Sequence, residues 1–201
     1  MSKQKSFPHI VSLDEWLKAR QAVFEEEQAF AKQRNALISK RRELPVTQME
    51  DSHHFEGPDG EVRLIDMFGG ERQLLVYHFW FEPGEEPCQG CSAWTRDLGN
   101  LGGNFASLRE NDTALTYVSR ASANEIADVK RRRSWTMPWY SLIGDGFEEA
   151  TGFDGWAQIS IFLRDGNTVY LANVVPFDDL VNIGNHWTLL DRAPIGISKN
   201  D

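Results

Sequence analysis

The chain has 201 residues, a formal net charge of −9 and 41% hydrophobic residues, which is the composition of a soluble globular protein able to bury a core. The negative charge argues against general binding to nucleic acid or to an anionic membrane, and no stretch approaches the roughly 20 apolar residues of a membrane span. The first residues lead into no apolar segment, so we expect no secretory signal and a cytoplasmic location.

The first predicted element is one long helix over residues 12–42. Ser12 and Glu15 have the spacing of a capping box, which marks a helix start. Apolar pairs then recur every seven residues: Trp16/Leu17, Val23/Phe24, Phe30/Ala31 and Leu37/Ile38. This stripe packs either on the body of its own domain or on a second subunit, which would make the protein a homodimer. We expect residues 1–45 to form a helical extension and residues 46–201 the main domain.

After the helix, an extended segment from Val46 to Phe55 leads into the turn Gly57-Pro58-Asp59-Gly60 and a returning strand from Glu61 to Ile65. The central run follows, from Leu74 to Phe81. It is apolar on both faces, as is typical of an interior strand in a covered sheet. A hairpin followed by a buried central strand is therefore predicted.

The only two cysteines of the chain follow this strand as Cys88-Gln89-Gly90-Cys91, and residues 92–108 are predicted to form a helix. The free amides at a helix start stabilise a thiolate there, and a second cysteine one turn later can close on it as a disulfide. Zinc sites use the same spacing, but a tetrahedral site needs about four ligands and the chain has no second CxxC. A redox pair is favoured over a structural pair, and no metal is expected.

The remaining predicted elements alternate. Strands are predicted at residues 114–119, 140–143, 158–164 and 168–174, and helices at residues 123–135 and 178–190. This order predicts an α/β sandwich whose mixed sheet is covered on both sides. Ligands of such sheets bind beyond the carboxyl ends of the strands, where the cysteines lie and where Arg120 follows the neighbouring strand. Arg120 is either the cation that holds a thiolate or an anionic substrate group, or an ordinary surface arginine.

Several segments along the chain together match the pattern of a known protein family. They are Gly57-Pro58-Asp59-Gly60-Glu61-Val62, Leu75-Val76-Tyr77-His78-Phe79, Cys88-Gln89-Gly90-Cys91-Ser92, Val118-Ser119-Arg120-Ala121, Met137-Pro138-Trp139, Ser160-Ile161-Phe162-Leu163-Arg164-Asp165-Gly166 and Leu190-Asp191-Arg192-Ala193-Pro194-Ile195-Gly196. Together they resemble an uncharacterised bacterial thioredoxin-like family, a domain of unknown function with the number 899. The resemblance spans nearly the whole chain. It implies a thioredoxin-like α/β/α sandwich with a mixed central sheet and a long N-terminal helical extension.

The wider thioredoxin resemblance also implies roles for residues. Cys88 would be the attacking thiolate and Cys91 the resolving thiol. His78 falls where thioredoxins place a buried carboxylate, so it would accept the proton of Cys91 unless it is simply a core histidine. The expected function is a cytoplasmic thiol–disulfide oxidoreductase that reduces a small or protein disulfide rather than a peroxide. Its expected partners are a disulfide substrate and a thiol reductant, without a cofactor.

Two features favour a function of another class. Thioredoxins carry a cis-proline before the strand that faces the disulfide, whereas this chain has Gln158 and Ile159 there. The cysteine loop is also crowded with the negative charges of Glu82, Glu85 and Glu86, which are expected to raise the thiol pKa. The alternative is a non-catalytic thioredoxin-fold binding or scaffold protein whose cysteines do not cycle.

Overall fold

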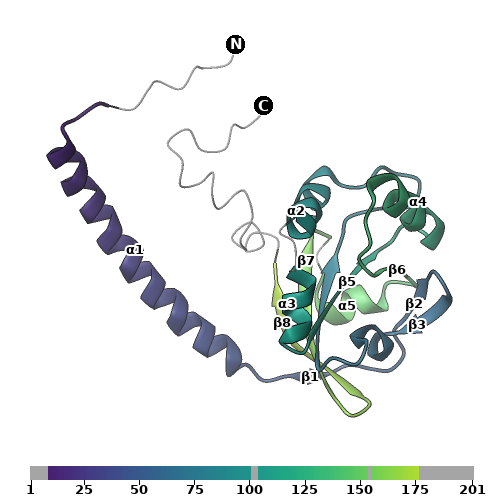
Figure 1. Cartoon of the computed structure of the whole chain (residues 1–201). Helices are drawn as coiled ribbons and strands as arrows, with labels where there is room; N and C mark the ends of the chain where they lie inside the picture. Colours follow the sequence, from purple (N-terminus) through teal and green to yellow (C-terminus); the bar gives the residue numbers. More distant parts are fainter. Residues whose placement is uncertain (1–8, 101–103, 154, 177–201) are drawn as a thin grey trace. The chain divides into compact units, whose positions relative to one another are not determined.

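The computed structural model of the chain describes residues 9–100, 104–153 and 155–176 (Figure 1). The helices among them are α1 (Leu13–Arg42), the 3₁₀ helix η1 (Leu64–Phe68), α2 (Gln89–Asn100), α3 (Asn104–Glu110), α4 (Ala123–Arg133) and α5 (Gly146–Thr151). The strands are β1 (Thr47–Gln48), β2 (His54–Gly57), β3 (Gly60–Arg63), β4 (Gln73–His78), β5 (Thr113–Ser119), β6 (Trp139–Leu142), β7 (Gln158–Asp165) and β8 (Thr168–Val175). The helix predicted over residues 178–190 lies outside the described residues.

Helix α1 begins at the predicted capping box. The Glu15 amide donates to the Ser12 hydroxyl, and the Ser12 amide donates to the Glu15 carboxylate at 3.0 Å. None of the 30 residues of α1 is buried. Residues up to Leu44 and the sheet that begins after Pro45 belong to different compact units. No helix in the part of the chain that the structure describes is long and apolar enough to cross a membrane.

The eight strands form one mixed sheet in the order β1-β8-β7-β4-β5-β6-β2-β3. Strand β4 lies inside it, parallel to β5 and antiparallel to β7. The pairs β2–β3 and β7–β8 are antiparallel hairpins. This is the thioredoxin-like arrangement: the central strand leads to the cysteines, a parallel strand lies on one side of it and an antiparallel hairpin on the other. The predicted fold class is therefore confirmed.

Both faces of the sheet are covered, because successive residues of a strand point to opposite sides. On one face, Tyr77 of β4 packs in a cluster with Trp94 of α2 and Ile126 of α4. On the other face, Val76 belongs to a cluster that includes Phe147 of α5 and residues of η1. The apolar side chains of β4 thus alternate between two separate cores, Leu75 and Tyr77 in one and Leu74 and Val76 in the other.

The described elements differ from the predicted ones in several places. The strand predicted to end at Ile65 ends at Arg63, and the central strand ends at His78 instead of Phe81. The helix expected over residues 92–108 corresponds to α2, which starts three residues earlier, and to α3, and residues 101–103 lie outside the described part of the chain. Helices η1 and α5 were not predicted at all. They are five and six residues long, too short to show a helical period in the sequence.

Candidate functional site

The paired cysteines lie at the start of α2, as the sequence predicts. The chain leaves β4 and returns so that the Cys88 amide donates to the carbonyl of Trp80 at 3.1 Å. The Cys88 carbonyl then accepts from the Ser92 amide at 2.9 Å and from the Ser92 hydroxyl at 2.7 Å. Because α2 begins at Gln89, Cys88 occupies the position directly before the helix. Its side chain therefore faces the free amides of the first turn.

The Cys88 sulfur uses one of these amides. The Cys91 amide donates to it at 3.4 Å, in the manner of a side chain that caps a helix. Cys88 is half-buried, whereas Cys91 is only 2% exposed, and both thiols are free. The pair thus consists of one thiol that a substrate can reach and one held beneath it in the core.

The two thiols have very different acidities. The hydrogen bond with the Cys91 side chain is the main cause that lowers the pKa of Cys88 to about 6, and the amides of Cys91 and Gly90 contribute, against the opposing effect of burial. The bond with Cys88 and burial raise the pKa of Cys91 well above its ordinary value. The loop glutamates, which were expected to raise the pKa of the attacking thiol, are not among the main causes of this shift, and local hydrogen bonds lower the pKa instead.

This asymmetry gives the first testable prediction. Since only the thiolate reacts, alkylation of Cys88 by iodoacetamide is expected to rise with pH, with a midpoint of about 6, and to level off above it. Cys91 should stay unmodified over the same range because it is buried and protonated. Mass spectrometry of the modified peptides measures both rates. A Cys88 midpoint near the ordinary thiol value of about 8.5 would contradict the prediction.

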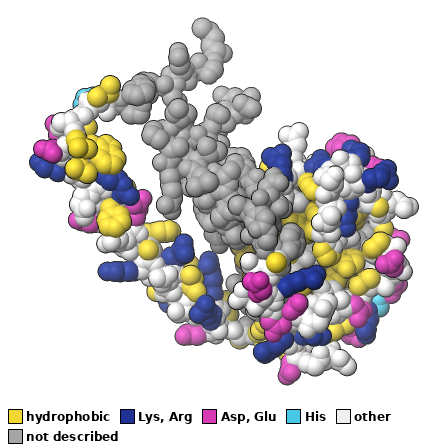
Figure 2. Space-filling view, in the orientation of Figure 1, with side chains coloured by type: hydrophobic (Ala, Val, Ile, Leu, Met, Phe, Trp, Pro, Cys, Tyr) yellow, Lys and Arg dark blue, Asp and Glu magenta, His cyan; other side chains and the backbone are white. Residues whose placement is uncertain are grey.

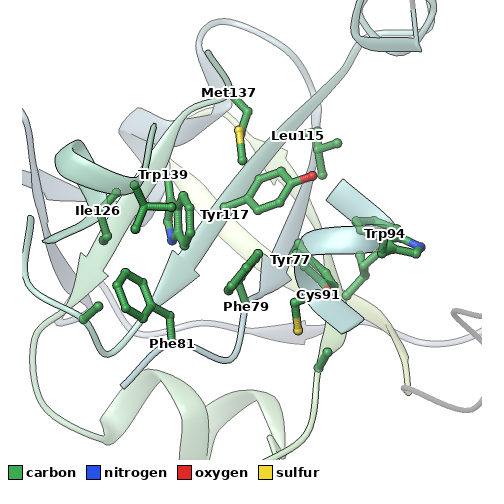
Figure 3. Close-up of a cluster of buried hydrophobic side chains, with 14 residues drawn as sticks. Tyr77, Phe79, Phe81, Cys91, Trp94, Leu115, Tyr117, Ile126, Met137 and Trp139 are labelled. Carbon is green, nitrogen blue, oxygen red and sulfur yellow. The ribbon is translucent and has the colours of Figure 1, made fainter. Parts of the chain in front are cut away.

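Two buried tyrosines complete this site, and the sequence analysis missed both. Interaction with the Tyr77 hydroxyl lowers the pKa of Cys91 in opposition to burial, and burial raises the pKa of Tyr77 well above its usual value, so the phenol keeps its proton. The Tyr77 ring stacks on Trp94 with 4.3 Å between centroids, and Tyr117 packs against its edge at 5.2 Å (Figure 3). The alternation of side chains along a strand could have predicted the position of Tyr77, because Tyr77 and Phe79 share the face that α2 covers.

His78 points to the opposite face of the sheet. Its Nε2 lies 3.0 Å from the Ser160 hydroxyl, and its ring stacks between Phe147 and Phe153. Burial lowers the pKa of His78 to about 3, so the imidazole is neutral. The structure therefore does not bring His78 to Cys91, since the sheet lies between them.

Arg120 lies beyond the carboxyl end of β5, as predicted, but its charge is directed to carboxylates. Its guanidinium forms an ion pair with the buried Glu148 and lies 2.9 Å from the Asp145 carboxylate. The hydrogen bond with Glu148 is the main cause that raises the pKa of Arg120. Arg120 and His78 both line a cavity of about 240 Å³ whose described lining includes neither cysteine. The four predicted site residues thus divide into two places.

The structure also shows the position where thioredoxins carry a cis-proline and the surroundings of the side chains that could bind a metal. Gln158 begins β7, and its side-chain amide donates to the Ser160 hydroxyl at 3.3 Å. No peptide bond among the described residues is cis. Within those same residues, no three histidine, cysteine, aspartate or glutamate side chains gather closely enough to hold a metal ion.

The chain matches one family model, described as "Bacterial protein of unknown function (DUF899)", over residues 5–200. No curated protein sequence matches it.

Among solved structures, the chain is similar to the exposed lipoprotein thioredoxin of Streptococcus pneumoniae, with 14% identity, 65% of this chain and 89% of the other covered, and a TM-score of 0.45. It is similar to a thiol:disulfide interchange protein from Bacteroides sp., with 15% identity, 78% and 90% coverage and a TM-score of 0.44. It is also similar to peroxiredoxin 5 from Alvinella pompejana, with 11% identity, 67% and 90% coverage and a TM-score of 0.47. At such low identity, the chemistry of this chain must be judged from its own residues.

Proposed function

The chain belongs to this bacterial family of unknown function, and we propose that it is a thiol–disulfide oxidoreductase. One observation carries the proposal: a half-buried Cys88 with a lowered thiol pKa stands at the start of α2, hydrogen-bonded to a buried Cys91. A thiol with a pKa of about 6 is mostly thiolate at neutral pH, which is the form that attacks disulfides.

The proposed reaction begins when the Cys88 thiolate attacks one sulfur of a substrate disulfide. The substrate S–S bond breaks, its other sulfur leaves as a thiolate that takes a proton, and a mixed disulfide forms. The Cys91 sulfur then attacks the Cys88 sulfur, gives up its proton and releases the second substrate thiol. The substrate gains two electrons and two protons, and the protein keeps a Cys88–Cys91 disulfide. A thiol reductant then reduces the Cys88–Cys91 disulfide and restores the two free thiols.

Tyr77 has a defined part in the second step. Interaction with its hydroxyl in a buried cluster lowers the pKa of Cys91, so it stabilises the charge that develops when Cys91 loses its proton. The high pKa of Tyr77 keeps this hydroxyl protonated throughout. We propose that Tyr77, rather than His78 or Arg120, orients and activates the resolving thiol.

The substrate that we propose is a small or protein disulfide. The cytoplasmic setting expected from the sequence is part of the proposal, because the two free thiols would be kept reduced there.

A redox titration with thiol counting tests this function. The purified chain is equilibrated in glutathione buffers of defined potential, and its free thiols are counted by alkylation and mass spectrometry. We expect two thiols to disappear together and reversibly, with a midpoint between about −300 and −120 mV, the range of known dithiol proteins. If Cys88 and Cys91 form no reversible disulfide in that range, the oxidoreductase proposal fails.

One observation favours the scaffold alternative. Within the described residues, no cationic side chain is among the groups that lower the pKa of Cys88, and the Arg120 guanidinium is engaged by Glu148 and Asp145. A scaffold would retain its cellular effect after Cys88→Ser, whereas an oxidoreductase would lose it. A deletion strain complemented with either form distinguishes the two.

A further inference from the structure

Helix α1 exposes a stripe of large apolar side chains along its length. Trp16, Val23 and Phe30, spaced seven residues apart, are 53%, 52% and 66% exposed. Figure 2 shows such yellow side chains along the helix, interspersed with basic and acidic ones. An exposed series of this size marks a surface that is covered by a partner. A strict seven-residue repeat is also the spacing at which one helix packs along another.

Charged residues run along the middle of this stripe with the same spacing. Arg20, Glu27 and Arg34 each follow an apolar pair by three and four residues, which places them on the same helix face. The Arg20 guanidinium forms an ion pair with Glu27 at 2.9 Å and lies 5.6 Å from the centre of the Phe24 ring. The stripe therefore presents alternating charges, positive, negative and positive, between its apolar pairs.

This charge order restricts how a second copy of the helix can pack on the first. In a parallel pair in register, Arg20, Glu27 and Arg34 would each face their own copy, and like charges in contact are destabilising. In an antiparallel pair with the two-fold axis between Val23 and Phe24, Arg20 lies opposite Glu27 of the partner subunit. The same register places Glu15 opposite Lys32 of the partner subunit. Of these two arrangements, the antiparallel one places opposite charges together.

The apolar side chains match in that same register. Leu17 lies opposite Phe30 of the partner subunit, and the large Trp16 lies opposite the small Ala31 of the partner subunit. At the axis, Val23 lies opposite Phe24 of the partner subunit. One register thus pairs the apolar residues from Trp16 to Ala31 and the charges of Arg20 and Glu27, whereas Arg34 lies opposite Leu13 of the partner subunit.

We propose that α1 is a homodimerisation helix that pairs with α1 of a second copy in antiparallel orientation, with the two-fold axis between Val23 and Phe24. The sequence pattern alone allows a second subunit or the chain's own domain as the occupant of the stripe. Charge complementarity favours a second copy and sets its direction, because Arg20, which pairs with Glu27 of its own helix, then also lies opposite Glu27 of the partner subunit.

Cysteine cross-linking of the full-length chain tests the orientation. In a Cys88→Ser/Cys91→Ser background, Phe24→Cys is expected to form an interchain disulfide on mild oxidation, because the two copies of residue 24 lie next to the axis. Phe30→Cys is the matched control. Its two copies lie about 20 Å apart along the axis at roughly 1.5 Å per residue, too far for a disulfide. Cross-linking of both variants would indicate a parallel pair and cross-linking of neither a different occupant, and either result overturns the proposal.

Charge exchange tests the register independently of any cysteine. Arg20→Glu is expected to raise the dimer dissociation constant by a factor of about ten, and the double variant Arg20→Glu/Glu27→Arg to restore it. Sedimentation equilibrium of each full-length variant measures the constant, and circular dichroism checks that helix content is unchanged. A monomeric wild-type chain, or a double variant as weak as the single one, overturns the proposal. Since Cys88 and Cys91 take no part, these outcomes are separate from the oxidoreductase test.

Discussion

Cys88→Ser is expected to lower disulfide reduction by a factor of about 10³ or more, since a serine hydroxyl stays protonated at neutral pH and cannot replace the attacking thiolate. The structure gives the reason for choosing Cys88: it is the accessible member of the pair, and its pKa is lowered to about 6. Steady-state reduction of insulin or of oxidised glutathione with dithiothreitol as reductant measures the loss.

Cys91→Ser is the matched variant, because it removes the buried thiol and leaves the attacking one. It should still attack the substrate but not resolve the product, so a mixed disulfide at Cys88 should accumulate and be visible by mass spectrometry. If a mixed disulfide accumulated in the Cys88→Ser protein instead, Cys91 would be the attacking cysteine and Cys88 the resolving one. Equal activity of wild type and Cys88→Ser would refute the proposed mechanism.

Trp139→Ala is expected to reduce the free energy of unfolding by about 3–5 kcal/mol, the usual cost of removing a large aromatic side chain from a core. Trp139 is 3% exposed, and the centre of its ring lies 4.6 Å from that of Phe79, the residue that directly follows the central strand (Figure 3). Its indole N–H donates to the Ser119 hydroxyl at 3.0 Å, so the substitution also removes a buried hydrogen bond. Urea unfolding followed by circular dichroism measures the change.

Trp156→Ala supplies the control for this measurement. Trp156 is 62% exposed, so the same change of side chain should alter the free energy of unfolding by only about 0.5 kcal/mol. Similar losses for the two variants would mean that the cluster around Trp139 is not a tightly packed part of the core.

Local sequence signals predicted much of the fold correctly. The capping box at Ser12 and the turn from Gly57 to Gly60 depend on residues close together in the chain, and both are found as predicted. The apolar run before the cysteines forms the central strand, and Cys88 stands at the start of a helix. These features follow from backbone preferences that act over a few residues. The two short helices η1 and α5 escaped prediction because they contain too few turns to show a period.

Side-chain partners in the site depended on contacts between distant parts of the chain. Arg120 was expected either to hold a thiolate or an anionic substrate group or to be an ordinary surface arginine, and in the structure its guanidinium pairs with Glu148, 28 residues further on. The acidic loop was expected to raise the pKa of Cys88, but the hydrogen bond with the Cys91 side chain lowers it to about 6. The partner of Arg120 could not be read from neighbouring residues, because it depends on which groups the folded chain brings within bonding distance, whereas the groups that lower the pKa of Cys88 lie only two and three residues further along the chain.

The sequence by itself determined where the candidate site is located: a strand, a loop and two cysteines at the start of a helix. Only the tertiary structure decided which residues surround those cysteines. Tyr77 and His78 are adjacent in the sequence, yet one belongs to the core beside Cys91 and the other stacks on Phe147 across the sheet. The physical reason is strand geometry, because consecutive side chains point to opposite faces and the covering helices determine the environment of each face.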